Sequence, residues 1–317
     1  MRITYPVPAQ TSSVFVVVTD RTPTDLSSIV PWRMRPSHRR AARDALGTPR
    51  LTLEAFRSAR SPWRRMDLSA EDLRRVRRAR HHVVVTSTAP VEEQPEAAQV
   101  ARAAARGIAE AYHGGLYDPL TGAAVYHCAE CPGERRDFHL GDDWLGWRVS
   151  CADEEHACAL RLGAAAPAGA DADGGCSCLV TTSRGLRRFG LPEITLTGLA
   201  CAHSLCAVTV LRTVAESLLA GHLAWLSTGL LAPCRGVARR LLVAGMDYAV
   251  LSGGADLDSG PFHIPGADYG SPRGTPDEES GLLRVRLTPA AAALSCLRPG
   301  GRDGNPRPHH TPGLLVA

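Results

Sequence analysis

The sequence predicts an α+β protein: a largely antiparallel sheet with two main helices on one face, ferredoxin-like or related. Two observations indicate this class. A β-branched run at residues 82–88 is followed at once by a helical pattern, and strand alternation at residues 193–197 precedes a long apolar run with helical spacing. Two helices on one face of such a sheet would bury both apolar stripes.

The predicted domain spans residues 63–290. With 317 residues, the chain can bury a core without disulfides or metals. Residues 163–175, rich in Ala, Gly, Asp and Pro, are expected to form a flexible insert. We expect residues 1–62 to be a poorly ordered basic N-terminal extension, apart from a short strand at 14–18, and residues 291–317 to be a disordered tail.

The first half of the domain begins with a short helix. Ser69 is expected to cap it, and the helix runs to Arg80. The strand at 82–88 is followed by a helix that starts near Pro95 and ends before two glycines, with an apolar stripe formed by Val100, Ala104, Ile108 and Ala111. Short strands are expected at 116–118 and 123–127.

The second half opens with a turn at 141–146 that enters a strand. Trp144 and Trp147 are expected to pack in the core and at its edge. Further strands are predicted at 178–182, 193–197, 241–243, 248–251 and 282–287. Ser204 is expected to cap the longest helix, whose apolar positions are Leu205, Val208, Leu211, Val214, Leu218, Leu219 and Trp225.

The charge is unevenly distributed. All 36 basic residues are Arg, which indicates GC-rich codon usage. Residues 31–80 hold fifteen Arg against five acidic residues, a net charge of +10, whereas the chain from residue 81 onward is acidic. This Arg-rich segment could bind nucleic acid through phosphates or fold back on the acidic body, and we favour the second alternative.

The sequence predicts a cytoplasmic protein. Residues 1–20 lack the apolar continuity of a secretory signal, and the most apolar segment, 205–231, is interrupted by Arg212, Glu216 and His222. In the cytoplasm, ten cysteines are expected to be reduced thiols or metal ligands, not a disulfide framework.

Two phrases carry a resemblance. Residues 81–122 and 182–225, with Thr-Thr-Ser-Arg-Gly-Leu-Arg-Arg-Phe-Gly-Leu-Pro-Glu at 181–193, resemble an uncharacterised protein family of actinobacteria-like, GC-rich genomes. The resemblance spans about residues 55–290. Because that family has no assigned activity, it implies no catalytic residues.

A cysteine pair indicates a metal site. Cys128 and Cys131 form a Cys-x-x-Cys pair before Pro132 and Gly133, as in a zinc knuckle. The other two ligands of a structural zinc could come from Cys176 and Cys178 or from the segment Cys201 to Cys206, which includes His203. Cys176 and Cys178 are the first choice, although the second pair has irregular spacing. We expect Cys201 and Cys206 to pack at the entrance of the long helix, since unpaired cysteine is often buried.

Two other groups of residues are weaker candidates. Residues 184–188, Arg-Gly-Leu-Arg-Arg, could hold a phosphate or carboxylate, but a solvated turn is the favoured interpretation. His203 and Cys206 could form a base and thiol pair, the basis of an alternative as a cysteine-dependent hydrolase or transferase.

No complete catalytic constellation is present in the sequence, so an enzymatic activity is neither predicted nor excluded. The leading hypothesis is a cytosolic, non-enzymatic binding or regulatory domain with a structural zinc site, acting on an unknown protein or ligand partner and not on a membrane.

Overall fold

The computed structural model describes residues 2–34, 36–126, 133–141, 143–151, 178–199, 201–229, 233–238, 240–243, 247–253 and 283–287. The predicted insert at 163–175 and the predicted tail at 291–317 lie outside the described residues.

The first sheet has five strands, all paired antiparallel, in the order β3-β4-β2-β5-β6. Its central strand β2 pairs along its whole length with β4 and also contacts β5. The strands are β2 (Gln10–Thr19), β3 (Thr52–Arg57), β4 (His81–Pro90), β5 (Gly115–Asp118) and β6 (Ala123–Ala124).

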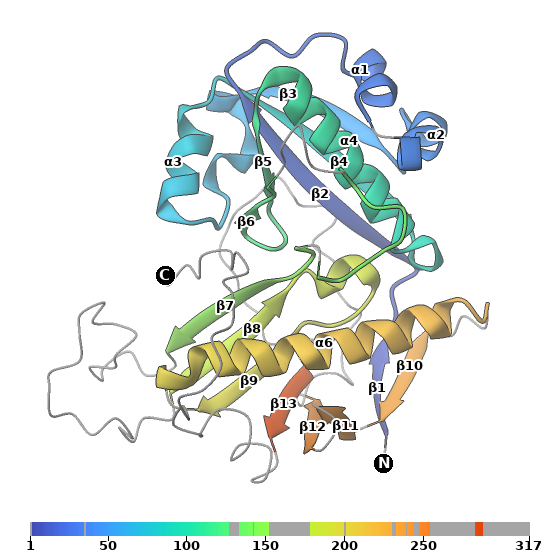
Figure 1. Ribbon diagram of the computed structural model, residues 1–317, viewed down its shortest axis with the longest axis vertical. Coiled ribbons are helices and arrows are strands. Elements are labelled where there is room, and N and C mark those ends of the chain that lie inside the picture. Colours follow the sequence, from blue (N-terminus) through green and yellow to red (C-terminus); the bar gives the residue numbers. More distant parts are fainter. Residues whose placement is uncertain are drawn as a thin grey trace, which may run out of the picture.

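Helices cover both faces of this sheet. Side chains alternate between the faces of a strand, so β2 places Phe15 and Val17 in one core and Val14 and Val16 in another. The first core lies under α4 (Glu96–Tyr112) and the second under α3 (Ala70–Arg78). Figure 1 shows these two helices on either side of the strands.

Helix α4 is buried on nearly every side because α1 (Leu26–Arg33) and α2 (Pro36–Ala45) pack against it from outside. Its many alanines allow close approach to the sheet. Short 3-10 helices complete this half: η1 (Ser58–Arg60), η2 (Pro62–Arg65) and η3 (Val91–Glu93).

The second sheet has six strands in the order β11-β12-β13-β9-β8-β7, with one parallel pair, β13 and β9. Helix α6 (Ser204–Leu226) lies across it and packs on β8, β9 and β11 (Figure 1). The strands are β7 (Gly146–Cys151), β8 (Leu179–Arg184), β9 (Ile194–Leu199), β11 (Arg240–Val243), β12 (Asp247–Gly253) and β13 (Leu283–Leu287); η4 (Leu186–Phe189) and η5 (Cys201–His203) follow β8 and β9.

A two-stranded sheet joins the N-terminus to the second half. Strand β1 (Arg2–Pro6) pairs antiparallel with β10 (Cys234–Ala238). The main core continues from the first sheet to the second through aromatic contacts, since the Trp144 ring lies 6.5 Å from Phe15 and 6.0 Å from Phe189 between ring centroids. Trp144 is fully buried and Trp147 packs at the edge, as predicted.

The α+β class and the mainly antiparallel pairing are confirmed. The arrangement differs from the expected one in that α4 and α6 each pack on a different sheet. The strand predicted at 14–18 is part of β2, the central strand, whereas residues 52–57, expected in a poorly ordered extension, form an edge strand of the first sheet. Their partners in β4 and β5 are distant in the sequence, so no local pattern marked the pairing.

Among the described residues, α6 is the one helix long and apolar enough to cross a membrane. Its buried residues pack against β8 and β9, as in the core helix of a soluble protein, and they include the imidazole of His222. The structure is therefore compatible with a soluble protein.

Candidate functional site

Three cysteines meet at one end of the second sheet. Cys151 ends β7, Cys178 directly precedes β8, and Cys201 follows β9 in η5. Because the three strands are antiparallel neighbours, the end of β7, the start of β8 and the end of β9 lie together. The three sulfur atoms all lie within 4.8 Å of one another, and the Sγ atoms of Cys178 and Cys201 are 3.3 Å apart.

This thiol cluster, Cys151, Cys178 and Cys201, could hold a metal ion. Tetrahedral zinc with Zn–S bonds of about 2.3 Å requires sulfurs roughly 3.8 Å apart, so small side-chain rotations would bring the three thiolates into range. A disulfide requires about 2.05 Å, so none joins Cys178 to Cys201. Cys201 is 3% exposed and the other two are half-buried, which limits access of water.

The cluster overlaps the predicted ligand set at one residue. Cys178 belongs to both, whereas Cys128, Cys131 and Cys176 lie outside the described residues, so their role stays a prediction. Cys151 was not considered as a ligand. Cys201 was an alternative ligand and was expected to pack at the helix entrance, where it does lie buried. The missed information was strand register: Cys151 pairs with Leu179, next to Cys178.

The second thiol candidate does not offer a nucleophile in this state. Cys206 lies in the first turn of α6 and is disulfide-bonded, which corrects the expectation of a reduced thiol or metal ligand at this position, so it holds no thiolate for attack. Helix α6 begins at Ser204 itself, with His203 in the cap position and no side-chain capping hydrogen bond, which corrects the expected cap.

The Arg-Gly turn is largely buried, in contrast to the solvated turn that the sequence favoured. Gly185 and Gly190 have positive φ angles of 109° and 80° and bound the 3-10 helix η4. Arg188, inside η4, is fully buried, and its Nη2 donates to Asp118 Oδ2 at 2.5 Å. Since Asp118 ends β5, this ion pair joins the two sheets.

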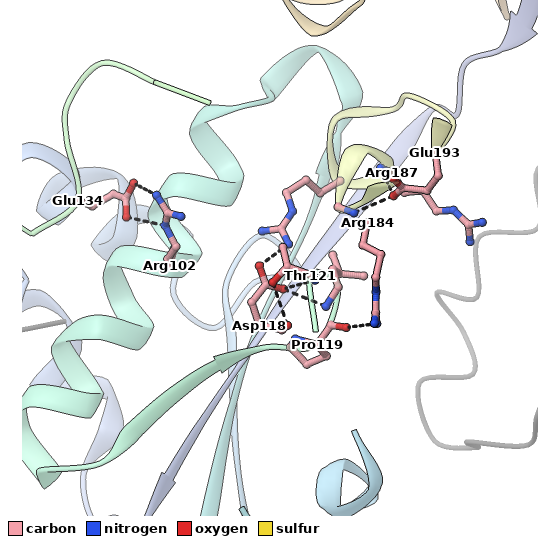
Figure 2. A network of polar contacts seen from close by, with 11 residues as sticks. Arg102, Asp118, Pro119, Thr121, Glu134, Arg184, Arg187 and Glu193 are labelled. Carbon is pink, nitrogen blue, oxygen red and sulfur yellow. Dashed lines mark hydrogen bonds and ion pairs between the residues drawn. The ribbon is translucent and has the colours of Figure 1, made fainter. Parts of the chain in front are cut away.

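Glu193 closes the same turn from the other side. Its carboxylate accepts hydrogen bonds from Ser183 Oγ at 2.6 Å and from the backbone N–H groups of Gly185 and Arg187 at 2.8 and 3.3 Å. Burial raises the pKa of Glu193, and these donors with the nearby Arg187 charge oppose that effect. Figure 2 shows Glu193 against the turn and Arg184 extended to the carbonyl of Pro119.

A cavity of about 380 Å³ opens beside this turn. Its lining includes the face of β7 and β8 that carries Arg148, Ser150, Val180 and Thr182, together with residues of the first half of the chain. We call it the arginine cavity; its other lining residues are Asp67, Pro119, Leu120, Ser183, Arg184, Gly185, Arg187 and Glu193.

A further polar group lies under α6. Arg235 Nη1 donates to the Tyr5 hydroxyl at 2.9 Å, and that hydroxyl lies 3.1 Å from Nδ1 of His222. Burial, and then the Arg235 charge, lower the pKa of His222 to about 4, while burial raises the pKa of Tyr5 to about 12. Both groups are therefore neutral near pH 7, and the tyrosine can donate to the imidazole.

The two Arg-bearing α-helices of residues 31–80 that lie wholly within the described residues, α2 and α3, pack on opposite faces of the first sheet. Helix α2 packs its Ala42 into the core under α4, whereas α3 packs its Val76 into the core on the opposite face of the sheet. The Arg residues of α2 and α3 are therefore carried by helices on opposite faces of the first sheet.

Comparisons of the chain with protein-family models, with curated proteins and with solved structures find no match.

Proposed function

We propose that this chain is a cytoplasmic, non-enzymatic binding or regulatory protein in which Cys151, Cys178 and Cys201 hold a structural zinc ion. The supporting observation is the meeting of three sulfur atoms within 4.8 Å at the ends of three neighbouring strands. Thiolates are soft ligands that favour zinc, and three of them leave one of its four positions for a further donor.

A structural role is favoured over a catalytic one by the surroundings of the cluster. A catalytic zinc keeps an open position that faces a substrate cavity. None of the three cysteines lines the arginine cavity. All three pack against the main core, where a bound ion would fasten β7, β8 and η5 to one another.

Metal analysis of the purified full-length chain tests the proposal. We expect one zinc per chain, and we expect Cys151→Ser, Cys178→Ser and Cys201→Ser each to lose it because each removes a thiolate. Cys234→Ser is the matched control, since Cys234 is an exposed thiol on β10 outside the cluster. Substoichiometric zinc that none of the three cluster substitutions changes would refute the site.

An absorption measurement on the wild-type protein tests the same site without requiring that the variants fold. Wild-type protein loaded with Co²⁺ in place of zinc should show the intense sulfur-to-cobalt charge-transfer absorption of a thiolate-rich tetrahedral site. Weak octahedral spectra, or copper as the metal found in the purified protein, would contradict a structural zinc.

A further inference from the structure

The arginine cavity combines cationic and apolar walls. Arg148, Arg184 and Arg187 line it together with the apolar side chains of Leu120 and Val180. Its volume of about 380 Å³ falls in the range of small-molecule sites. Guanidinium groups recognise oxyanions through paired hydrogen bonds, whereas apolar walls accept an organic body.

Two of the three cations share one carboxylate. Asp67 Oδ2 accepts from Arg184 Nη1 at 2.7 Å and lies 3.4 Å from Arg148 Nη2. Asp67 is 60% exposed and lies between η2 and α3, so the carboxylate that binds Arg148 and Arg184 is at the solvent-exposed edge of the cavity. Even with Asp67 and Glu193 both ionised, the three guanidinium groups leave a net positive charge.

Arg187 lies near the Glu193 carboxylate, and its charge opposes the rise in the Glu193 pKa. Its backbone N–H bonds Glu193, but within the described part of the chain its buried Nε has no hydrogen-bond partner. Buried donors are nearly always satisfied in folded proteins, and this one belongs to a residue that lines the cavity, so it is available to an acceptor there. An oxyanion in the cavity would supply it.

We propose that the arginine cavity binds a small organic anion, a carboxylate or phosphate on an apolar body, anchored by the Arg187 guanidinium. This inference rests on the proposed binding function and names its ligand class. None of the three cysteines lines the cavity, so anion binding can be measured whether or not zinc is bound. Absence of zinc and absence of anion binding are thus separate results.

The test measures binding of four probes to the full-length chain by isothermal titration calorimetry, supported by NMR. Benzoate and phenyl phosphate share one ring and differ in the anion. Benzyl alcohol lacks the charge, and inorganic phosphate lacks the ring. We expect benzoate or phenyl phosphate to bind at millimolar concentration, with the better of the two identifying the anion, and the other two probes to bind more weakly.

Substitution of the anchor should weaken that binding. Arg187→Gln removes a charge-assisted hydrogen bond, which corresponds to roughly 10- to 100-fold in affinity. Arg187→Lys keeps the charge and should lose less affinity for the anion than Arg187→Gln does. Arg40→Gln is the charge-matched control, because Arg40 lies on α2 with a side chain 90% exposed.

Three outcomes would overturn the inference: no binding of either aromatic anion, equal binding in wild type and folded Arg187→Gln, or binding of benzyl alcohol as tight as that of benzoate. Circular dichroism establishes that the variants are folded. If Arg187→Gln does not fold, Arg187→Lys is measured in its place. The site would then be refuted if Arg187→Lys binds the anion as tightly as wild type does and added salt does not weaken that binding.

Discussion

The Arg188–Asp118 ion pair should dominate the attachment of the two sheets. Both side chains are fully buried, and Arg188 also lies over the rings of Phe15 and Trp144, 5.5 and 5.3 Å from their centroids. Asp118→Asn keeps the acceptor Oδ1 that receives the backbone N–H of Leu120 at 2.9 Å. The substitution removes the charge and replaces Oδ2, the acceptor of Arg188 Nη2, with an amide NH2 group that cannot accept.

The expected loss of unfolding free energy depends on the burial of the Arg188–Asp118 pair. Removing one partner of a buried pair leaves the other charge uncompensated and lowers the free energy of unfolding by about 3–5 kcal/mol. Nε and Nη1 of Arg188 have no partner within the described residues, so the cation has no alternative acceptor there. The exposed Arg50–Glu93 pair is the control, and Glu93→Gln should cost about 1 kcal/mol or less.

Urea denaturation followed by tryptophan fluorescence measures both variants at pH 7. The double substitution Asp118→Asn with Arg188→Met should recover much of the loss, because it removes the uncompensated cation. The reasoning fails if Asp118→Asn costs no more than Glu93→Gln, or if the double variant is as unstable as the sum of the two single substitutions.

Three further predictions concern a cap, a titration and a surface. Ser69 Oγ accepts the backbone N–H of Asp72 at 3.0 Å, so Ser69→Ala should lower the free energy of unfolding by about 1 kcal/mol in urea melts, whereas an unchanged midpoint would exclude the cap. The pKa of His222 is depressed to about 4, so as pH falls from 6.5 to 4 the unfolded chain binds the proton first and the free energy of unfolding decreases by about 3 kcal/mol. His222→Gln should flatten this part of the plot of unfolding free energy against pH, and an unaltered plot would contradict the reasoning. Because α2 and α3 lie on opposite faces, we expect little duplex DNA binding in gel-shift assays at physiological salt, and tight, salt-sensitive binding would restore the nucleic-acid alternative.

Local patterns predicted the elements whose stability is itself local. The helix after Ser69 begins with the predicted cap, since Ser69 accepts from Asp72 within the first turn. The strand at 82–88 and the helix that follows are present as β4 and α4, because β-branched runs and apolar stripes are read directly from neighbouring residues.

Non-local pairing explains what the sequence did not predict. The apolar run at 14–18 was recognised as a strand, but its central place in the sheet depends on β4 and β5, far along the chain. The buried role of Arg188 depends on Asp118, seventy positions earlier. A run of arginines predicts a solvated turn unless the carboxylate that neutralises it is known.

Non-local pairing also forms the thiol cluster, because its cysteines lie at the ends of separate strands and not in a Cys-x-x-Cys motif. Cys178 was predicted as a ligand from its proximity to Cys176 in the sequence. Its partners in the structure are Cys151 and Cys201, placed by the register of β7 and β9 on β8. Spacing rules identify metal sites formed by one loop, whereas sites formed by sheet topology require the strand order.

The proposed zinc site and the arginine cavity are expected to be coupled through β7. Cys151 ends this strand and packs toward the core, whereas Arg148, three residues earlier, lines the cavity. Strand β7 is an edge strand paired only with β8 among the described strands, so its end depends on side-chain anchoring. Removal of zinc by a chelator should therefore loosen Arg148 and weaken binding of the aromatic anion several-fold, while Arg187→Gln leaves the zinc content unchanged. Equal anion affinity of the zinc-bound and zinc-free chains would show that the β7–β8 pairing alone holds the cavity wall.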